Sequence, residues 1–192
     1  AEAVKSLSCP VLLNGNVTSS NSANYLKELT GAHGVMIGRS AIRNPWICRQ
    51  IREAQLKVPV FKPTMADVYE FIIDLYQSLE KPGMEERKKV GRIKKFLNFV
   101  GLSVDREGDF LHQMRRSQTQ KGLFDVCDSH LIKNGNAECL YNLEPFEGLV
   151  ARPSSEAPLN SCQLVWGESN DSCFFEKVIP GNIAFAFLIR SS

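Results

Sequence analysis

The chain has 192 residues, of which 43% are hydrophobic and 23% are charged, as in an ordinary soluble globular protein. No apolar run reaches the ~18 residues that a membrane-spanning helix requires, so we expect no membrane span. The net charge of +2 indicates no partner, but residues 84–121 carry a net charge of +5 and residues 134–192 carry −4. A basic stretch of this size is typical of a segment that contacts a polyanion such as RNA, although a solvated helix face gives the same pattern.

The first residues suggest a piece of a longer protein. The sequence begins with Ala1 rather than Met, and it begins inside an apolar pattern with no cap or turn signal. We therefore expect that further sequence precedes Ala1, and we give no meaning to the lack of a targeting signal.

Residues 10–38 have the pattern of a βαβ unit. The apolar run Pro10–Leu13 precedes Asn14-Gly15 and predicts a buried strand that ends in a tight turn. Residues 19–29 have helical spacing and are followed by Gly31, a common residue at the C-terminal end of helices. Residues 34–38 are a second apolar run that ends in glycine. The interval of about 30 residues therefore predicts two parallel strands joined by a helix.

Helices are predicted from Pro45 onward. Pro45 is typical of a first helical turn, and we expect the helix to continue over residues 46–56. Residues 58–63 contain two prolines and predict a linker. Thr64 and Asp67 then have the spacing of a capping box. Apolar spacing, with glycine and proline breaks, predicts an antiparallel bundle of about four helices over residues 64–79, 85–100, 105–114 and 118–132.

One of these predicted helices carries basic residues on a single face. Its apolar stripe consists of Val90, Ile93, Leu97 and Val100. At about 100° per residue, the opposite face holds Lys88, Arg92 and Lys95.

The regular pattern ends after Asn134. Residues 134–192 contain four prolines, scattered Ser, Asn and Gly, and short apolar runs such as residues 183–189 that are candidate strands. We expect this segment to be irregular or partly disordered. The predicted fold class is an α/β fragment over residues 1–57, an all-α unit over residues 64–132, and an irregular tail over residues 134–192.

The two predicted strand ends carry the candidate binding residues. Asn14, Gly15 and Asn16 follow the first strand, and Gly38 and Arg39 follow the second. In parallel α/β sheets and barrels, ligands bind at the C-terminal ends of the strands. Exposed backbone N–H groups at both glycines, together with the Arg39 guanidinium, predict an anion site of the kind that holds a cofactor phosphate. Each glycine taken singly would only indicate a tight turn.

These segments resemble a known family. The runs Pro10–Asn16, Leu29–Arg39 and Asn44–Trp46 are similar to motifs of the tRNA-dihydrouridine synthases. The resemblance implies the last two strands of a (β/α)₈ barrel that binds FMN, followed by an antiparallel helical domain that binds tRNA. It covers residues 10–55 strongly, fits residues 64–132, and does not extend past residue 134.

The resemblance also implies roles for individual residues. The FMN phosphate would be held by Asn14, Gly15, Asn16, Gly38 and Arg39. Phosphates of tRNA would be contacted by Lys88, Arg92, Lys94 and Lys95. The implied reaction is reduction of uridine to dihydrouridine in tRNA, with NADPH or NADH as the reductant.

No catalytic residue is expected in this chain. The family's catalytic cysteine belongs to a loop far upstream of these segments. Cys9 precedes Pro10 as in the family's Cys-Pro motif, but it stands at the wrong end of the predicted strand. The three histidines are widely separated and no Cys-x-x-Cys pair occurs, so we also expect no metal site and mostly buried, reduced cysteines.

Two alternative functions stay open. The first is another FMN-dependent barrel oxidoreductase that acts on a small molecule. The second is a non-catalytic RNA-binding product of truncation. We expect a monomer in the cytoplasm, with an organellar location left open.

Overall fold

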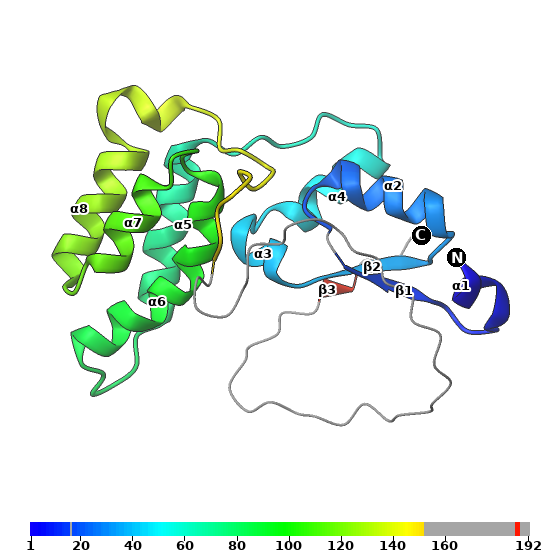
Figure 1. The fold of residues 1–192 in the computed structure, drawn as a ribbon, viewed down its shortest axis with the longest axis horizontal. Helices are drawn as coiled ribbons and strands as arrows, with labels where there is room; N and C mark the ends of the chain where they lie inside the picture. Colours follow the sequence, from blue (N-terminus) through cyan, green and yellow to red (C-terminus); the bar gives the residue numbers. More distant parts are fainter. Residues whose placement is uncertain (16, 152–186, 189–192) are drawn as a thin grey trace.

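The computed structural model describes residues 1–15, 17–151 and 187–188. Figure 1 shows an α/β unit, which holds the blue and cyan elements up to residue 55, beside a helical unit that begins at residue 65. Residues 59–63 have no regular structure and run between the two units, as the sequence predicts. Each unit has its own cluster of buried apolar side chains.

The centre of the α/β unit is a short sheet. β1 (Leu12–Asn14) pairs in parallel with β2 (Gly34–Ile37), and Asn14 lies opposite Met36. This register confirms the predicted parallel pairing. On the other side of β2, β3 (Phe187–Leu188) pairs with it in the antiparallel direction.

Local caps determine the helix that connects the two parallel strands. α2 (Ser20–Thr30) begins after Ser19, whose hydroxyl accepts the N–H of Ser22, and ends at Gly31 with a left-handed φ of 70°. Both ends agree with the prediction from the sequence. Two further helices follow β2, namely α3 (Arg39–Arg43) and α4 (Ile47–Gln55). The buried apolar core of the unit consists of Val17, Ala23, Val35, Ile37, Ile47 and Ile51.

The first strand is less buried than the sequence predicts. Leu12 is 42% exposed, and Asn14 is also exposed. β1 lies at the edge of the described sheet, so a strand covers it on one side only. The prediction of a fully buried strand was therefore wrong for β1. It is confirmed for β2, where Val35 and Ile37 are each 1% exposed.

The start of α4 differs slightly from the prediction. Pro45 precedes the helix instead of occupying its first turn, because α3 ends at Arg43 and Asn44 is extended, with φ −123° and ψ 90°. A residue before proline is driven out of the helical region by the proline ring, which separates α3 from α4. At the other end of the unit, α1 (Glu2–Ser6) forms one short helix that the sequence did not predict.

Helices of the second unit occur where the apolar spacing predicts them. They are α5 (Met65–Ser78), α6 (Glu86–Val100), α7 (Asp109–Arg116) and α8 (Gln120–Leu131). The predicted capping box is present, since Asp67 Oδ2 accepts the N–H of Thr64 at 2.6 Å and Thr64 Oγ1 accepts the N–H of Asp67 at 3.2 Å. Throughout the described ranges, no helix has both the length and the apolar character needed to cross a membrane.

The turn between α6 and α7 brings two helices very close together. A Cβ at Gly101 would lie 2.4 Å from Leu111 Cδ2, so only glycine fits there without a shift of the core. α7 begins four residues later than predicted because Gly108 is left-handed, with φ 79°. The Asp105 carboxylate still acts at the helix start, where it accepts the N–H groups of Asp109 and Phe110 at 2.7 and 2.9 Å.

Residues 133–151 are irregular, as expected, but they are packed against the helices. After the 3₁₀ segment η2 (Lys133–Glu138), Leu140 forms a β-bridge with Thr64, and Tyr141 is 3% exposed within the helical core. In Figure 1 this yellow segment passes between the two units. The rest of the predicted tail, residues 152–186 and 189–192, lies outside the described residues.

Candidate functional site

The predicted binding residues meet at one edge of the sheet. Because Asn14 lies opposite Met36, Gly15 and Gly38 follow adjacent parallel strands at the same end. Asn14, Gly15, Gly38 and Arg39 are all exposed. Asn16 lies outside the described residues. The strand ends thus bring together two separate motifs of the sequence, as the site prediction requires.

The backbone at these strand ends is accessible. Gly15 has a φ of 140°, which L side chains rarely adopt, so the conformation favours glycine. A Cβ built on Gly15 or on Gly38 would meet no other atom within 4 Å. Exposed glycine backbone at two adjacent strand ends, together with the exposed Arg39, is a combination that can bind a phosphate.

A buried arginine ties these strand ends to the helical unit. Arg43, at the end of α3, is 3% exposed. Its guanidinium donates to Thr18 O at 2.7 Å, to Ser103 Oγ at 2.9 Å and to Leu143 O at 2.6 Å. Burial lowers the pKa of Arg43, while Tyr141 and Glu144 act in the opposite direction. Thr18 lies just after the first strand-end motif, so one side chain joins the loop after β1, η1 (Gly101–Ser103) and the segment after η2.

Tyr141 completes this connection. Its hydroxyl lies 3.1 Å from Arg43 O and 2.8 Å from Val100 O, and it donates to these carbonyls. Burial raises the pKa of Tyr141 far above its ordinary value, so the hydroxyl keeps its proton. Neither Arg43 nor Tyr141 could be identified from the sequence, because neither stands in a motif or at a periodic position.

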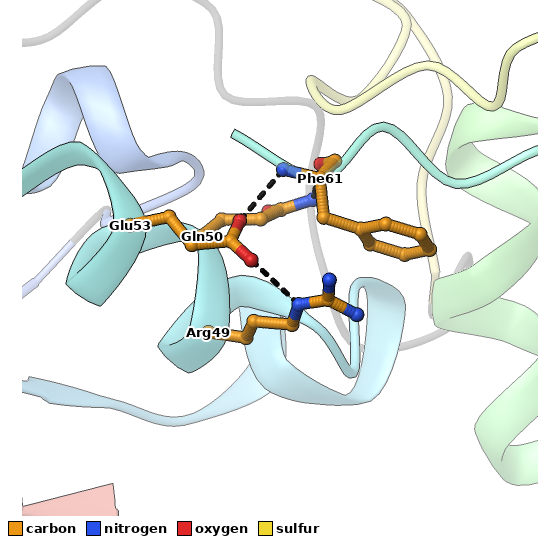
Figure 2. Close-up of polar contacts among 4 residues, drawn as sticks. All are labelled: Arg49, Gln50, Glu53 and Phe61. Carbon is orange, nitrogen blue, oxygen red and sulfur yellow. Dashed lines mark hydrogen bonds and ion pairs between the residues drawn. The ribbon is translucent and has the colours of Figure 1, made fainter. Parts of the chain in front are cut away.

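The linker is also attached to the α/β unit (Figure 2). The Glu53 carboxylate accepts the N–H of Phe61 and Nε of Arg49, each at 2.6 Å. These hydrogen bonds lower the pKa of Glu53, the Phe61 bond most strongly. Gln50 Nε2 donates to Phe61 O at 3.0 Å, and the Arg49 guanidinium lies 4.2 Å from the centroid of the Phe61 ring. The beginning of the linker is therefore held on α4.

The Trp46 ring contacts aromatic rings of the linker and of α5. The Trp46 ring lies 5.9 Å from the Phe61 ring and 6.1 Å from the Phe71 ring, centroid to centroid. Asn44 is fully buried nearby and donates to Gln50 Oε1 at 2.7 Å. Its Oδ1 has no hydrogen-bond partner within the described part of the chain.

Three of the four predicted RNA contacts lie together on α6. Lys88, Arg92 and Lys95 are exposed, while the apolar stripe of the same helix is buried in the core. We call these three side chains the basic face. The exposed ion pair between Lys88 and Glu85, at 3.3 Å, is of a kind that contributes little to stability. The face is therefore available to an anionic partner.

Lys94 lies apart from the basic face. Its ammonium is half-buried and donates to Arg115 O at 2.6 Å and to Ser117 O at 2.8 Å, at the C-terminal end of α7. Burial lowers the pKa of Lys94. Helical spacing already places Lys94 away from Lys88 and Arg92, but its structural role at the end of α7 could not be read from the sequence.

The remaining candidates lie far from the strand ends. Cys9 is exposed and precedes β1, at the opposite end of the strand from Gly15. Cys127 is buried, which raises the pKa of its thiol to about 12, whereas Cys139 is exposed, unlike the buried thiols expected from the sequence. Cys162 and Cys173 lie outside the described residues. No group of three or more His, Cys, Asp or Glu side chains in the described segments could hold a metal ion.

Comparisons with known proteins agree with the motifs. A family model described as dihydrouridine synthase matches residues 1–134. The chain is 33% identical over 88 residues to tRNA-dihydrouridine synthase B of Pasteurella multocida, covering 45% of this chain and 26% of the relative. It is 38% identical over 74 residues to a probable tRNA-dihydrouridine synthase of Helicobacter pylori, covering 38% and 23%. It is 28% identical over 109 residues to tRNA-dihydrouridine(16) synthase of Escherichia coli, covering 57% and 33%. These matches span about a quarter to a third of the relatives' lengths.

Proposed function

The chain belongs to the dihydrouridine synthase family, and from this premise we propose that it acts as part of a tRNA-dihydrouridine synthase. The proposed reaction is the reduction of uridine to dihydrouridine in tRNA, with FMN as the cofactor and NADPH or NADH as the reductant. One observation carries the proposal: the strand ends with Gly15, Gly38 and Arg39 are joined through buried contacts to a helical unit that bears an exposed basic face. We propose that β1 and β2 are the last two strands of a (β/α)₈ barrel, with domain limits of 1–57, 64–132 and 134–192.

The strand ends fit the phosphate of FMN. We assign the phosphate to Asn14, Gly15, Asn16, Gly38 and Arg39. The open space above both glycines leaves their backbone accessible, and the exposed guanidinium of Arg39 supplies a fixed positive charge. When bound, the flavin supplies the hydride that reduces the C5–C6 double bond of the uracil. The residues of this chain bind and orient the phosphate end, and we assign no catalytic role to any of them.

The basic face fits the phosphates of tRNA. Lys88, Arg92 and Lys95 lie on one exposed side of α6 and can each contact the backbone of a structured RNA. The basic face favours an enzyme that acts on RNA over one that acts on a small molecule, because a small substrate would not require an extended basic surface on a separate helical unit. Contacts of this kind position the RNA and carry no sequence information.

Arg43 and Tyr141 would hold the two sites at a constant separation. A uridine that is reduced by the flavin must reach the strand-end side of the barrel while the rest of the tRNA is held by the helices. Buried hydrogen bonds from Arg43 to Thr18 and Ser103 span the two units. They therefore orient the RNA-binding unit relative to the cofactor-binding unit.

The proposed function can be tested with the purified product of the complete gene. We expect the purified protein to show flavin absorbance and to form dihydrouridine in tRNA that lacks it, with NADPH or NADH. Tight tRNA binding without any flavin would instead support a non-catalytic RNA-binding protein. Bound flavin without tRNA binding that weakens steeply with salt would support the small-molecule oxidoreductase.

A further inference from the structure

A second basic surface lies on the helical unit, away from the basic face. It is a groove of about 460 Å³ between the first half of α6 and the C-terminal end of α7. Arg87 and Lys94 line it from α6, and Arg115 and Arg116 line it from α7. None of the residues that line it is acidic. We call it the basic groove.

Backbone carbonyls and one side-chain amide hold two of these cations in place. Lys94 donates to the carbonyls of Arg115 and Ser117. Arg115 donates from Nε to Asn98 Oδ1 and from Nη2 to Val150 O, each at 2.7 Å. Arg116 Nη1 lies 3.1 Å from His112 Nδ1. Within the described ranges, none of the four cations forms an ion pair with a carboxylate, so no paired carboxylate compensates their charges.

Lys94 also reduces the repulsion that an anion would meet at the C-terminal end of α7. The last carbonyl groups of a helix carry partial negative charge and would repel a phosphate. In this chain the Lys94 ammonium donates hydrogen bonds to two carbonyls at this end of α7. Its positive charge offsets their partial negative charge. An ammonium has three N–H donors, so Lys94 retains one, and Arg115 retains further N–H groups beyond the two already used.

We propose that the basic groove binds a phosphate of the RNA backbone, as a tRNA contact separate from the basic face. The inference rests on the proposed function, because it takes tRNA as the source of the phosphate. Guanidinium groups bind phosphate oxygens in pairs of parallel hydrogen bonds, and Arg87, Arg115 and Arg116 provide three of them. On this assignment Lys94 contacts RNA as the sequence predicts, but through the groove.

Gly91 allows the groove to be tested without damage to the fold. It lies on α6 between Arg87 and Lys94 and lines the groove, and a Cβ there would meet no atom within 4 Å. Gly91→Glu places a carboxylate between two of the cations, where it competes with a phosphate. Gly91→Ala is the size control. Gln77→Glu, at an exposed position of α5 outside the groove, adds the same charge and is the charge control.

The experiment measures tRNA binding by the full chain at several salt concentrations. We expect Gly91→Glu to weaken binding by about tenfold at low salt and to reduce the salt slope by about one. Arg87→Gln should act in the same direction. Gly91→Ala should bind like the wild type, and Gln77→Glu should change the affinity by less than about twofold. Circular dichroism should show the same helix content for all variants.

Failures of the two proposals are distinguishable. If Gly91→Glu binds tRNA as tightly as Gln77→Glu while Lys88→Glu combined with Arg92→Glu weakens binding, the groove is not a phosphate site and the RNA-binding function stands. If the wild-type chain binds no tRNA, the proposed function fails, and the inference about the groove fails with it.

Discussion

The guanidinium of Arg43 and the hydroxyl of Ser103 lie 2.9 Å apart, although 60 residues separate them in the sequence. Both side chains are buried, and the Ser103 hydroxyl in turn donates to Glu144 O at 3.0 Å. This contact joins the end of α3 to the turn after α6. The orientation of the two units therefore depends on this buried cation together with the Tyr141 hydroxyl.

Replacement of Arg43 should destabilise the whole chain. Arg43→Met leaves Thr18 O, Leu143 O and Ser103 Oγ without their donor inside the protein. We expect a loss of about 3 kcal/mol in the free energy of unfolding, since unpaired buried polar groups are costly. Urea unfolding measures this loss. Arg52→Met, which removes an exposed cation from α4, is the control and should change the free energy of unfolding by less than about 0.5 kcal/mol. Equal losses in the two variants would contradict the role of Arg43.

Two glycines of the helical unit should respond in opposite ways to alanine. Gly101→Ala pushes a methyl group to within 2.4 Å of Leu111 Cδ2 in a closed core, so we expect a loss of about 1–3 kcal/mol. Gly91→Ala adds a methyl group in open space inside a helix, so we expect a gain of about 0.5–1 kcal/mol. Thermal unfolding of the two variants measures both signs. A stabilised Gly101→Ala variant would show that Leu111 can move aside.

Removal of the Arg39 guanidinium should weaken flavin binding. If Arg39 holds the phosphate of FMN, Arg39→Ala in the complete gene product should raise the dissociation constant of FMN by about tenfold or more. Fluorescence titration of the flavin measures this change. Arg52→Ala, which removes an exposed arginine from α4, serves as the control and should bind FMN normally. Unchanged flavin affinity in Arg39→Ala would refute the phosphate assignment.

Charge reversal on the basic face should weaken tRNA binding without loss of flavin. Lys88→Glu combined with Arg92→Glu replaces two exposed cations of α6. We expect weaker binding of tRNA and a salt slope reduced by about two, because each phosphate contact contributes about one to the slope. Filter binding measures the affinity, and absorbance measures the flavin. Lys5→Glu with Lys62→Glu, two exposed lysines outside α6, gives the same charge change as a control. If both double variants bind tRNA equally well, the face is only solvated surface.

Acid should release the linker from α4. Hydrogen bonds from Phe61 and Arg49 hold the pKa of Glu53 below its ordinary value of 4.5, so the folded state favours the carboxylate. The stabilisation is present above the ordinary pKa and is lost as the pH falls through the lowered pKa. Glu53→Gln should therefore be less stable than the wild type at pH 7, and the difference should shrink at about pH 3. A difference that is the same at both pH values would show that Glu53 does not act through its charge.

Much of the fold follows from local sequence. The parallel pairing of the two strands, the end of α2 at Gly31, the capping box at Thr64 and the buried stripe of α6 were all predicted, because each depends on spacing or on residues within one turn. The strand-end motifs were also found from sequence, since Gly15 and Gly38 each follow an apolar run. Whether these residues hold a phosphate stays a prediction.

Only the tertiary structure decided how the parts are joined. Arg43 bonds to residues 25, 60 and 100 positions away, and Tyr141 bonds to a carbonyl 98 positions away. Lys94 is the same residue type as Lys95, but its ammonium donates to a carbonyl 21 residues further along, at the end of α7. The spacing of apolar residues indicates which side of a helix or strand faces the core. The partner of a buried polar group depends instead on which distant segment packs against that group. The sequence alone therefore determined most of the elements and the candidate binding residues, and the folded chain determined which cations form buried hydrogen bonds and which are exposed.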